Sequence, residues 1–139
     1  MPNWCENRVE IYIEDEKELK RWRKTVESKE SKFDFNKIVP MPKELEDTVK
    51  GSNHVPSEEL KEKYGADNWY DWRIDNWGVK WEADVDEGHV EDDGDFIQYA
   101  FDTAWGPPTE IYYALKKKFP DIGITWFYDE PGMQFAGYL

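Results

Sequence analysis

The chain has 139 residues with 31 acidic and 18 basic side chains, and its formal net charge is -13 at pH 7. This charge disfavours binding to nucleic-acid phosphates and to anionic membranes, because both depend on Lys and Arg. Eight Trp, eight Tyr and seven Phe supply the apolar area of a buried core, which excludes a disordered chain.

The cysteine count and the hydropathy pattern narrow the class of protein further. Cys5 is the only cysteine, which excludes an intramolecular disulfide and a thiolate metal cluster. The N-terminal residues do not have the pattern of a secretory signal, and no apolar run is long enough for a membrane span. We therefore expect a cytoplasmic protein with a single domain over residues 1–139 and no cofactor.

The first two elements have clear periodicities. Apolar and polar residues alternate over 5–13, which is typical of a strand with one buried face. Leu19, Trp22 and Val26 then recur at helical spacing among charged residues, which predicts an amphipathic surface helix over 15–28.

The middle of the chain has weaker patterns. Residues 33–39 are expected to form a short extended segment. A helical and loop insertion follows at approximately 43–76, too short to have a core of its own. Within it, Ser57 is a suitable N-cap for a short helix that ends at Tyr64.

The last part of the chain predicts strands around one helix. Residues 79–85 and 97–101 each alternate, and the polar, glycine-bearing link between them favours an antiparallel hairpin. A helix is expected over 107–119, with three lysines at its C-terminal end. Strands are expected at 122–126 and, after a Pro-Gly turn, at 133–138.

This order predicts an α+β ferredoxin-like sandwich, in which two main helices pack on one face of an antiparallel sheet. The insertion near 43–76 and an extra C-terminal strand are additions to that plan. The term "ferredoxin-like" describes the topology alone, because one cysteine cannot hold an iron–sulfur cluster.

Five segments in order resemble the YubB ferredoxin-like domain family. They are residues 1–7, 33–45, 76–81, 103–108 and 130–137. The resemblance implies the same fold and a bacterial, plasmid or phage origin. The family has no assigned function, so the resemblance implies no catalytic residues.

The candidate ligand-binding residues are mostly aromatic: Trp77, Lys80, Trp81, Trp105 and Glu130. In a strand, Trp77 and Trp81 would share one face, and Trp105 would approach the same end of the sheet. Two interpretations remain open here. The rings are either core and sheet-edge packing or the lining of a pocket.

The acidic run over 82–95 has eight carboxylates and no Lys or Arg. It does not fit a calcium-binding EF-hand loop, because Gly88 and His89 would occupy the fifth and sixth positions of a loop that starts at Asp84. A solvated hairpin loop is the preferred interpretation, and a looser cation site is the alternative. His54 and His89 have no metal-ligand spacing, so no metal site is predicted.

Three functional hypotheses follow. The leading hypothesis is a non-enzymatic, acidic interaction module that binds a basic protein, conceivably by imitating the charge of DNA, as an accessory protein of a phage, plasmid or bacterial host. The second is a small-ligand-binding or enzymatic domain with a Trp-lined pocket. The third is single-stranded nucleic-acid binding on the sheet face, which the net charge opposes.

Overall fold

The centre of the fold is a five-stranded antiparallel sheet with the order β2-β3-β1-β4-β5. The structure is a computed structural model, and it describes residues 2–51 and 53–139. The strands are β1 (Trp4–Tyr12), β2 (Val90–Asp92), β3 (Phe96–Ala104), β4 (Ile124–Glu130) and β5 (Phe135–Tyr138). The helices are α1 (Glu16–Val26), α2 (Phe35–Ile38), α3 (Glu58–Tyr64), α4 (Trp69–Asn76) and α5 (Thr109–Lys118), with 3-10 turns η1 (Lys43–Leu45) and η2 (Glu87–His89).

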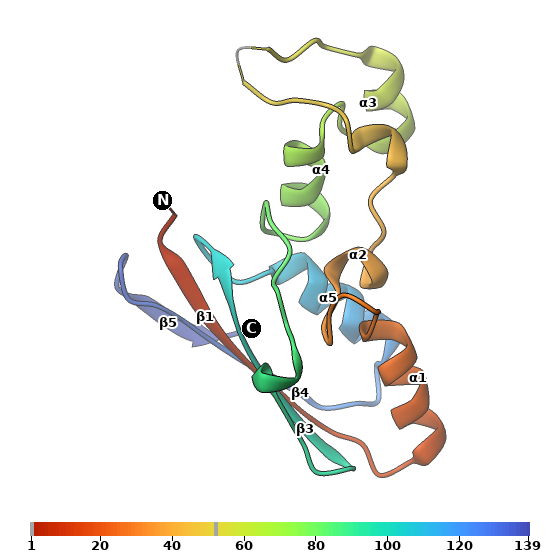
Figure 1. Ribbon diagram of the computed structural model, residues 1–139, viewed down its shortest axis with the longest axis vertical. Helices are drawn as coiled ribbons and strands as arrows, with labels where there is room; N and C mark the ends of the chain where they lie inside the picture. Colours follow the sequence, from red (N-terminus) through yellow and green to blue (C-terminus); the bar gives the residue numbers. More distant parts are fainter. Residues whose placement is uncertain (1, 52) are drawn as a thin grey trace.

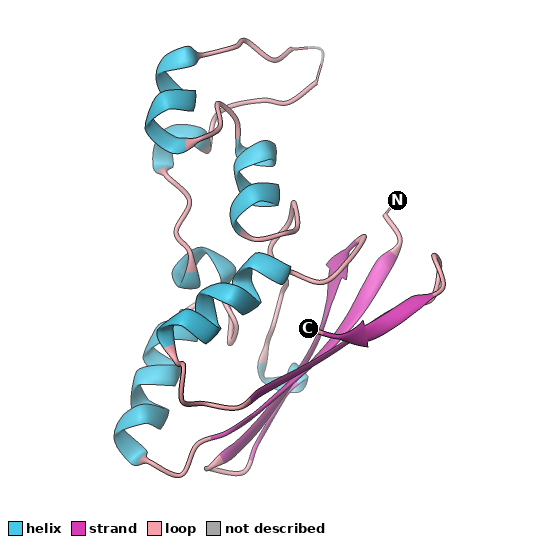
Figure 2. Ribbon diagram, turned by 180° about the vertical axis from the view of Figure 1, so that it is seen from behind, coloured by secondary structure: helices cyan, strands magenta, loops and turns pink. Residues whose placement is uncertain are grey.

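The topology confirms the predicted fold class. β1 lies between β3 and β4, and β2 pairs with the far side of β3, which is the strand arrangement of a ferredoxin-like sandwich. β5 extends this sheet beyond β4. Helices α1 and α5 lie on one face of the sheet, and the insertion with α3 and α4 lies beyond one end of it (Figures 1 and 2). Among residues 2–51 and 53–139, no α-helix covers the opposite face of the sheet, which we call the open face.

Alternation along β1 decides which side chains face the helices. Cys5, Asn7, Val9 and Ile11 are buried, and the residues between them lie on the open face. Residues directly opposite each other in paired strands share a face of the sheet. The register of β1 with β3 and β4 therefore shows which side chains of those strands face the helices and which lie on the open face.

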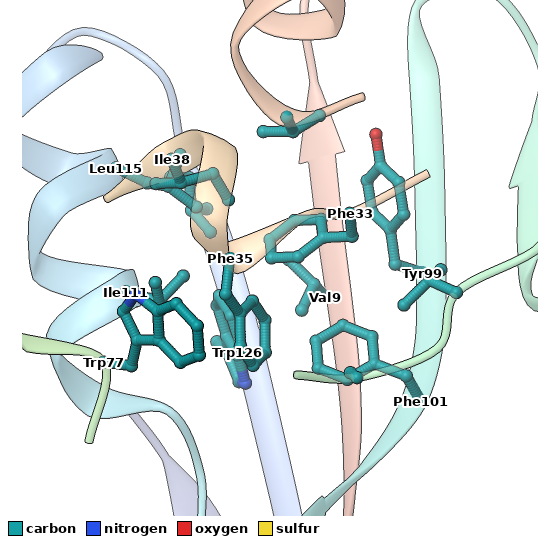
Figure 3. Close-up of a cluster of buried hydrophobic side chains, with 14 of the residues drawn as sticks. Val9, Phe33, Phe35, Ile38, Trp77, Tyr99, Phe101, Ile111, Leu115 and Trp126 are labelled. Atoms are coloured by element: carbon teal, nitrogen blue, oxygen red, sulfur yellow. The ribbon is translucent and has the colours of Figure 1, made fainter. Parts of the chain in front are cut away.

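Aromatic rings fill the space between the sheet and the helices (Figure 3). Phe33 lies at the centre, with ring centroids 5.0 Å from Tyr99, 5.3 Å from Phe101 and 5.7 Å from Trp126. Edge-to-face and offset pairs at this spacing add to the stability gained from burial. The expectation that rings provide most of the core is confirmed for this cluster.

Residues 33–39 do not form the extended segment expected from the sequence. Phe35–Ile38 is the helical turn α2, and its N-terminal amides have two caps. The Asp34 side chain accepts from Lys37 N at 3.2 Å, and the Glu82 carboxylate accepts from Phe35 N and Asn36 N, both at 2.9 Å. The second cap comes from a residue far along the chain, so local alternation could not predict it.

The expected strand at 79–85 is also wrong. Its alternation is only partial, since Val79 and Val85 are buried but Trp81 is exposed, and the segment has no ladder to β3. Its backbone is used elsewhere, because Val85 O accepts from Lys32 N at 2.7 Å. The hairpin instead pairs β2 with β3, in the register Val90↔Tyr99.

The insertion contains one helix that the sequence predicts and one that it does not. The helix α3 begins after Ser57, whose side chain accepts from Leu60 N, and it ends at Gly65 with φ 81°. The helix α4 is capped by Asn68, but only Trp72 of its residues is buried. Without an apolar stripe, α4 has no periodic signal in the sequence.

Within the described residues, none of the helices is long and apolar enough to cross a membrane.

Candidate functional site

Trp77, the first predicted site residue, is a core residue. Its side chain is fully buried at the end of α4, and its Nε1 donates to Val39 O at 2.8 Å. The ring packs against Phe35 and Trp72, with centroids 5.9 Å away in both cases. Trp81 is 39% exposed, so the expectation that Trp77 and Trp81 share a face is wrong. The reason is that α4 ends at Trp77 and the following segment forms no strand.

Trp81 and Lys80 form a small exposed cluster beside the start of β1. The ring of Trp81 lies 6.1 Å from that of Trp4, and the Lys80 ammonium lies 4.2 Å above the Trp81 ring. This is a cation–π contact at an exposed site, which stabilises by about 0.5–1 kcal/mol.

Trp105 follows β3 in a strained conformation. Its φ is +72°, which is unfavourable for a side chain with a Cβ, and its N–H donates to Asn3 O at 2.8 Å. The indole is 47% exposed. Trp105 and Lys80 line an open groove of about 520 Å³ between α4 and the end of β3, together with Tyr70 and Ile74. We call this the Trp105 groove.

Glu130 lies apart from that groove, on the helix-facing side at the end of β4. It is fully buried, and its Oε2 accepts from Met133 N in the turn before β5. Its Oε1 has no hydrogen-bond partner among the described residues. The nearby Cys5 is buried too, and burial raises the pKa of its thiol to about 11. The predicted site residues therefore occupy four separate places: the core, the Trp105 groove, the exposed contact of Trp81 with Trp4, and the β4–β5 turn.

The open face carries the most unusual charge arrangement. Glu6 on β1 is directly opposite Asp102 on β3 and directly opposite Asp129 on β4. Cross-strand neighbours have Cβ atoms about 4.5–5.5 Å apart, so three carboxylates form one line across three strands. We call Asp102, Glu6 and Asp129 the carboxylate row. Among the described residues, no ion pair includes any of the three.

A cation beside the carboxylate row on this face is already engaged. Arg8 lies in the next line of side chains, where its Nε is 3.6 Å from Glu10 Oε1 and its guanidinium is 5.2 Å from the Phe127 ring centroid. Ala100 is the third member of that line, and its small side chain leaves a hollow. An open groove of about 440 Å³ follows from this, lined by Glu6, Arg8, His89, Gln98, Ala100, Asp102 and Phe127 among others.

Exposed aromatic side chains lie on the same face of the sheet as the carboxylate row. Trp4 and Tyr12, at the two ends of β1, are 45% and 53% exposed, and Tyr138 on β5 is 66% exposed. Phe127 lies between them with intermediate exposure. Carboxylates and aromatic faces both attract cations, through charge and through the ring quadrupole respectively.

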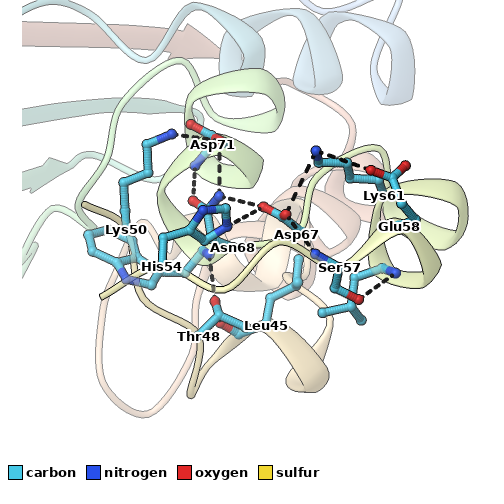
Figure 4. A network of polar contacts seen from close by, with 12 residues as sticks. Leu45, Thr48, Lys50, His54, Ser57, Glu58, Lys61, Asp67, Asn68 and Asp71 are labelled. Carbon is cyan, nitrogen blue, oxygen red and sulfur yellow. Dashed lines mark hydrogen bonds and ion pairs between the residues drawn. The ribbon is translucent and has the colours of Figure 1, made fainter. Parts of the chain in front are cut away.

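The insertion has a second polar cluster, which the sequence did not predict (Figure 4). Its centre is Asp67, which is 3% exposed and accepts from Ser57 N at 3.1 Å and from Asn68 Nδ2 at 2.9 Å. His54 Nε2 lies 2.8 Å from Asp67 Oδ1. These bonds hold the pKa of Asp67 well below its usual range. The cluster joins the loop before α3 to the start of α4, which is a structural role.

Three of the eight carboxylates in the acidic run 82–95 have structural roles. Glu82 caps α2, Asp86 accepts from Gly88 N at 2.9 Å in η2, and Asp92 forms a two-bond ion pair with Arg23. Within residues 2–51 and 53–139, no three His, Cys, Asp or Glu side chains are grouped to hold a metal ion. All eight carboxylates of the run are nevertheless exposed, which agrees with the solvated loop expected from the sequence.

Residues of the carboxylate row were outside the predicted site for a simple reason. Glu6, Asp102 and Asp129 are far apart along the chain, and each lies in an ordinary alternating pattern. Only the pairing register of β3, β1 and β4 places them together. The available signal was the polar face of each strand, which by itself suggests only contact with solvent.

Comparison with known families gives a match for one part of the chain. Residues 76–139 match the family model described as a ferredoxin-like domain in Api92-like protein. This region includes β2, β3, α5, β4 and β5, so the match agrees with the observed topology. Searches of curated proteins and of solved structures gave no significant match.

Proposed function

We propose that this protein is an interaction module whose open face binds a basic segment of a partner protein. The carboxylate row carries this proposal. Like charges placed directly opposite each other destabilise a sheet, by about 0.2–1 kcal/mol for each pair. Folding gains nothing from the arrangement, whereas a cationic partner would neutralise it. The flanking aromatic rings supply further contacts for Lys and Arg side chains.

The net charge of -13 supports the same proposal. A strongly negative protein attracts a basic partner over distance and accelerates their encounter, most strongly at low salt. A basic tail or arm that binds nucleic acid is one such partner, so imitation of DNA charge is a form of this proposal. The same charge repels nucleic acid itself.

The test uses a fluorescent oligolysine peptide and measures binding by anisotropy at several salt concentrations. We expect Glu6→Gln to weaken binding at least about threefold and to raise the free energy of unfolding by a few tenths of a kcal/mol. A gain in stability with a loss of binding is the signature of a functional charge cluster. The matched control is Glu62→Gln on the exposed side of α3, which makes the same change in net charge.

Two outcomes would contradict the proposal. If Glu62→Gln weakened binding as much as Glu6→Gln, the peptide would be responding to total charge and not to the open face. If single-stranded DNA bound at low salt and competed with the peptide, the face would be a nucleic-acid surface instead.

A second candidate function is supported by the Trp105 groove. The strained backbone of Trp105 and the exposure of its indole are both unfavourable for the fold alone, and such strain is concentrated at functional sites. With Lys80 at the rim, the groove suits a small aromatic carboxylate. Phenylacetate is a suitable probe, because its ring does not emit where Trp does, and a change in Trp fluorescence that disappears in Lys80→Gln would support this function. No change at millimolar ligand would rule it out.

The origin of the protein is part of the same proposal. Residues 1–7 and 33–45, which lie outside the matched family model, resemble the YubB ferredoxin-like family. That resemblance supports an accessory protein of a phage, a plasmid or a bacterial host, acting in the cytoplasm.

A further inference from the structure

We infer that the basic partner segment binds as an added strand on the free edge of β5, with a Lys or Arg opposite Ala136. This inference rests on the proposed function and specifies how the partner binds. The argument depends on the charge of the edge, on its free backbone groups and on the position of the carboxylate row.

The β5 edge has no charged residue or proline that would protect it against strand pairing. β5 is the outermost strand on its side of the sheet. Exposed edges are normally protected by Lys, other charges or Pro within the strand. Residues 131–139 contain no Asp, Glu, Lys or Arg, although 35% of the chain is charged. Phe135 and Tyr138 are instead 37% and 66% exposed.

The register shows which backbone groups of β5 are free. Leu139 N donates to Trp126 O at 3.0 Å, so this pair is hydrogen-bonded to β4. In an antiparallel pair, hydrogen-bonded and non-bonded positions alternate. Gly137 and Phe135 therefore also bond to β4, whereas Ala136 and Tyr138 direct their N–H and C=O groups away from it. A partner strand would complete its ladder on these two residues.

The carboxylate row ends at this edge. Asp129 is directly opposite Ala136, so a strand added beside β5 would place its own residue next in the line after Asp129 and Ala136. Strands are about 4.8 Å apart, so the added strand lies about 10 Å from β4. The small Ala136 side chain leaves a path between them, along which a Lys or Arg can reach the Asp129 carboxylate.

The same geometry sets the spacing of charges in the partner. The residue opposite Tyr138 lies two positions away and on the same face, where a cation can contact the phenol ring. The partner segment is therefore extended, with basic residues at alternate positions. Strand addition of this kind takes affinity from the backbone and specificity from alternate side chains.

A second copy of this chain fits the edge poorly. Symmetric pairing of two β5 strands would bring two carboxylate rows end to end, and each molecule carries a net charge of -13. Like charges facing each other across an interface oppose association. With a basic partner, the electrostatic interaction across the interface is attractive instead.

The test compares two fluorescent peptides of equal length and composition. In one, Lys and Val alternate, and in the other the lysines and valines form separate blocks. We expect the alternating peptide to bind at least about tenfold more tightly. Ala136→Pro should lower its affinity at least about tenfold, because proline removes the outward N–H but no bond to β4. Ala136→Ser keeps both that N–H and a small side chain, so it is the control for loss of backbone bonding.

Hydrogen exchange provides a readout in the unmutated protein. The amides of Ala136 and Tyr138 should become protected when the alternating peptide is added, which would support the inference even if Ala136→Pro impaired folding.

If Glu6→Gln weakened binding but Ala136→Pro and amide protection showed no effect, strand addition would be wrong and the open-face proposal would stand. If neither peptide bound, both would fail. Dimerisation of the peptide-free protein, abolished by Ala136→Pro, would assign the edge to a second copy and overturn the inference.

Discussion

The indole Nε1 of Trp126 donates a hydrogen bond to the side-chain oxygen of Asn7, at 3.0 Å, inside the core. Asn7 is 3% exposed, and its Nδ2 donates to Thr103 Oγ1 at 2.8 Å and to Cys5 O at 3.1 Å. One amide side chain on β1 thus joins β3 and β4 and satisfies a buried indole. Fully satisfied polar groups of this kind make a sheet register specific.

Asn7→Ala should therefore be one of the most destabilising polar substitutions. It leaves the Trp126 N–H and the Thr103 hydroxyl with fewer partners, and we expect a loss of about 2–4 kcal/mol in the free energy of unfolding. Urea denaturation followed by Trp fluorescence measures this loss. Thr125→Ala, at an exposed site on β4, is the control and should change stability by less than about 0.5 kcal/mol. Equal effects of the two substitutions would show that the Asn7 network contributes little.

A substitution at Gly78 tests how closely the end of the insertion packs against α5. Its φ is +87°, and a Cβ at this position would lie 2.8 Å from Thr109 N at the start of α5. We expect Gly78→Ala to cost about 2–4 kcal/mol, from an unfavourable φ and a clash with backbone. Gly94→Ala separates the two causes, because Gly94 has φ +90° but no atom within 4 Å of the added Cβ. Its cost should be about 1 kcal/mol in the same thermal or urea unfolding experiment. The clash would be refuted if both substitutions cost the same.

Cys5 should be unreactive in the folded protein. Burial raises its pKa to about 11, so roughly one thiol in a thousand is ionised at pH 8, and the side chain is inaccessible as well. Labelling with a chromogenic disulfide reagent should be at least about a hundredfold slower in buffer than in concentrated urea. Rapid labelling of the native protein would instead show that the start of β1 opens easily.

Asp67 makes the stability of the insertion depend on pH. Its hydrogen bonds lower its pKa in the folded state, so the folded state binds fewer protons than the unfolded chain. The resulting stabilisation is complete above the unfolded pKa of about 3.9 and is lost as pH falls below it. Asp67→Asn should therefore reduce stability at pH 7 and flatten its fall between about pH 5 and pH 3.

The control for Asp67 is Asp75→Asn, an exposed carboxylate at the end of α4. We expect this variant to keep the full acid dependence of the parent protein. Circular dichroism melting at a series of pH values distinguishes the two. An acid dependence that was unchanged in Asp67→Asn would show that other carboxylates control unfolding.

The amino-acid sequence by itself determined the elements with strong local periodicity. Alternation over 5–13 and 97–101, and helical spacing over 15–28, depend on one buried face each, and all three segments form the expected strand or helix. The cap at Ser57 was equally local, because its hydroxyl bonds an amide three residues later.

Tertiary structure decided what depends on residues distant in sequence. The helical turn α2 forms where the sequence predicted a short extended segment, because Glu82 caps it from the far side of the insertion. The carboxylate row likewise exists only in the register that places Glu6 between Asp102 and Asp129. Burial patterns are encoded within each segment, but capping partners and cross-strand neighbours are set by which segments meet, and a single sequence does not show these pairings.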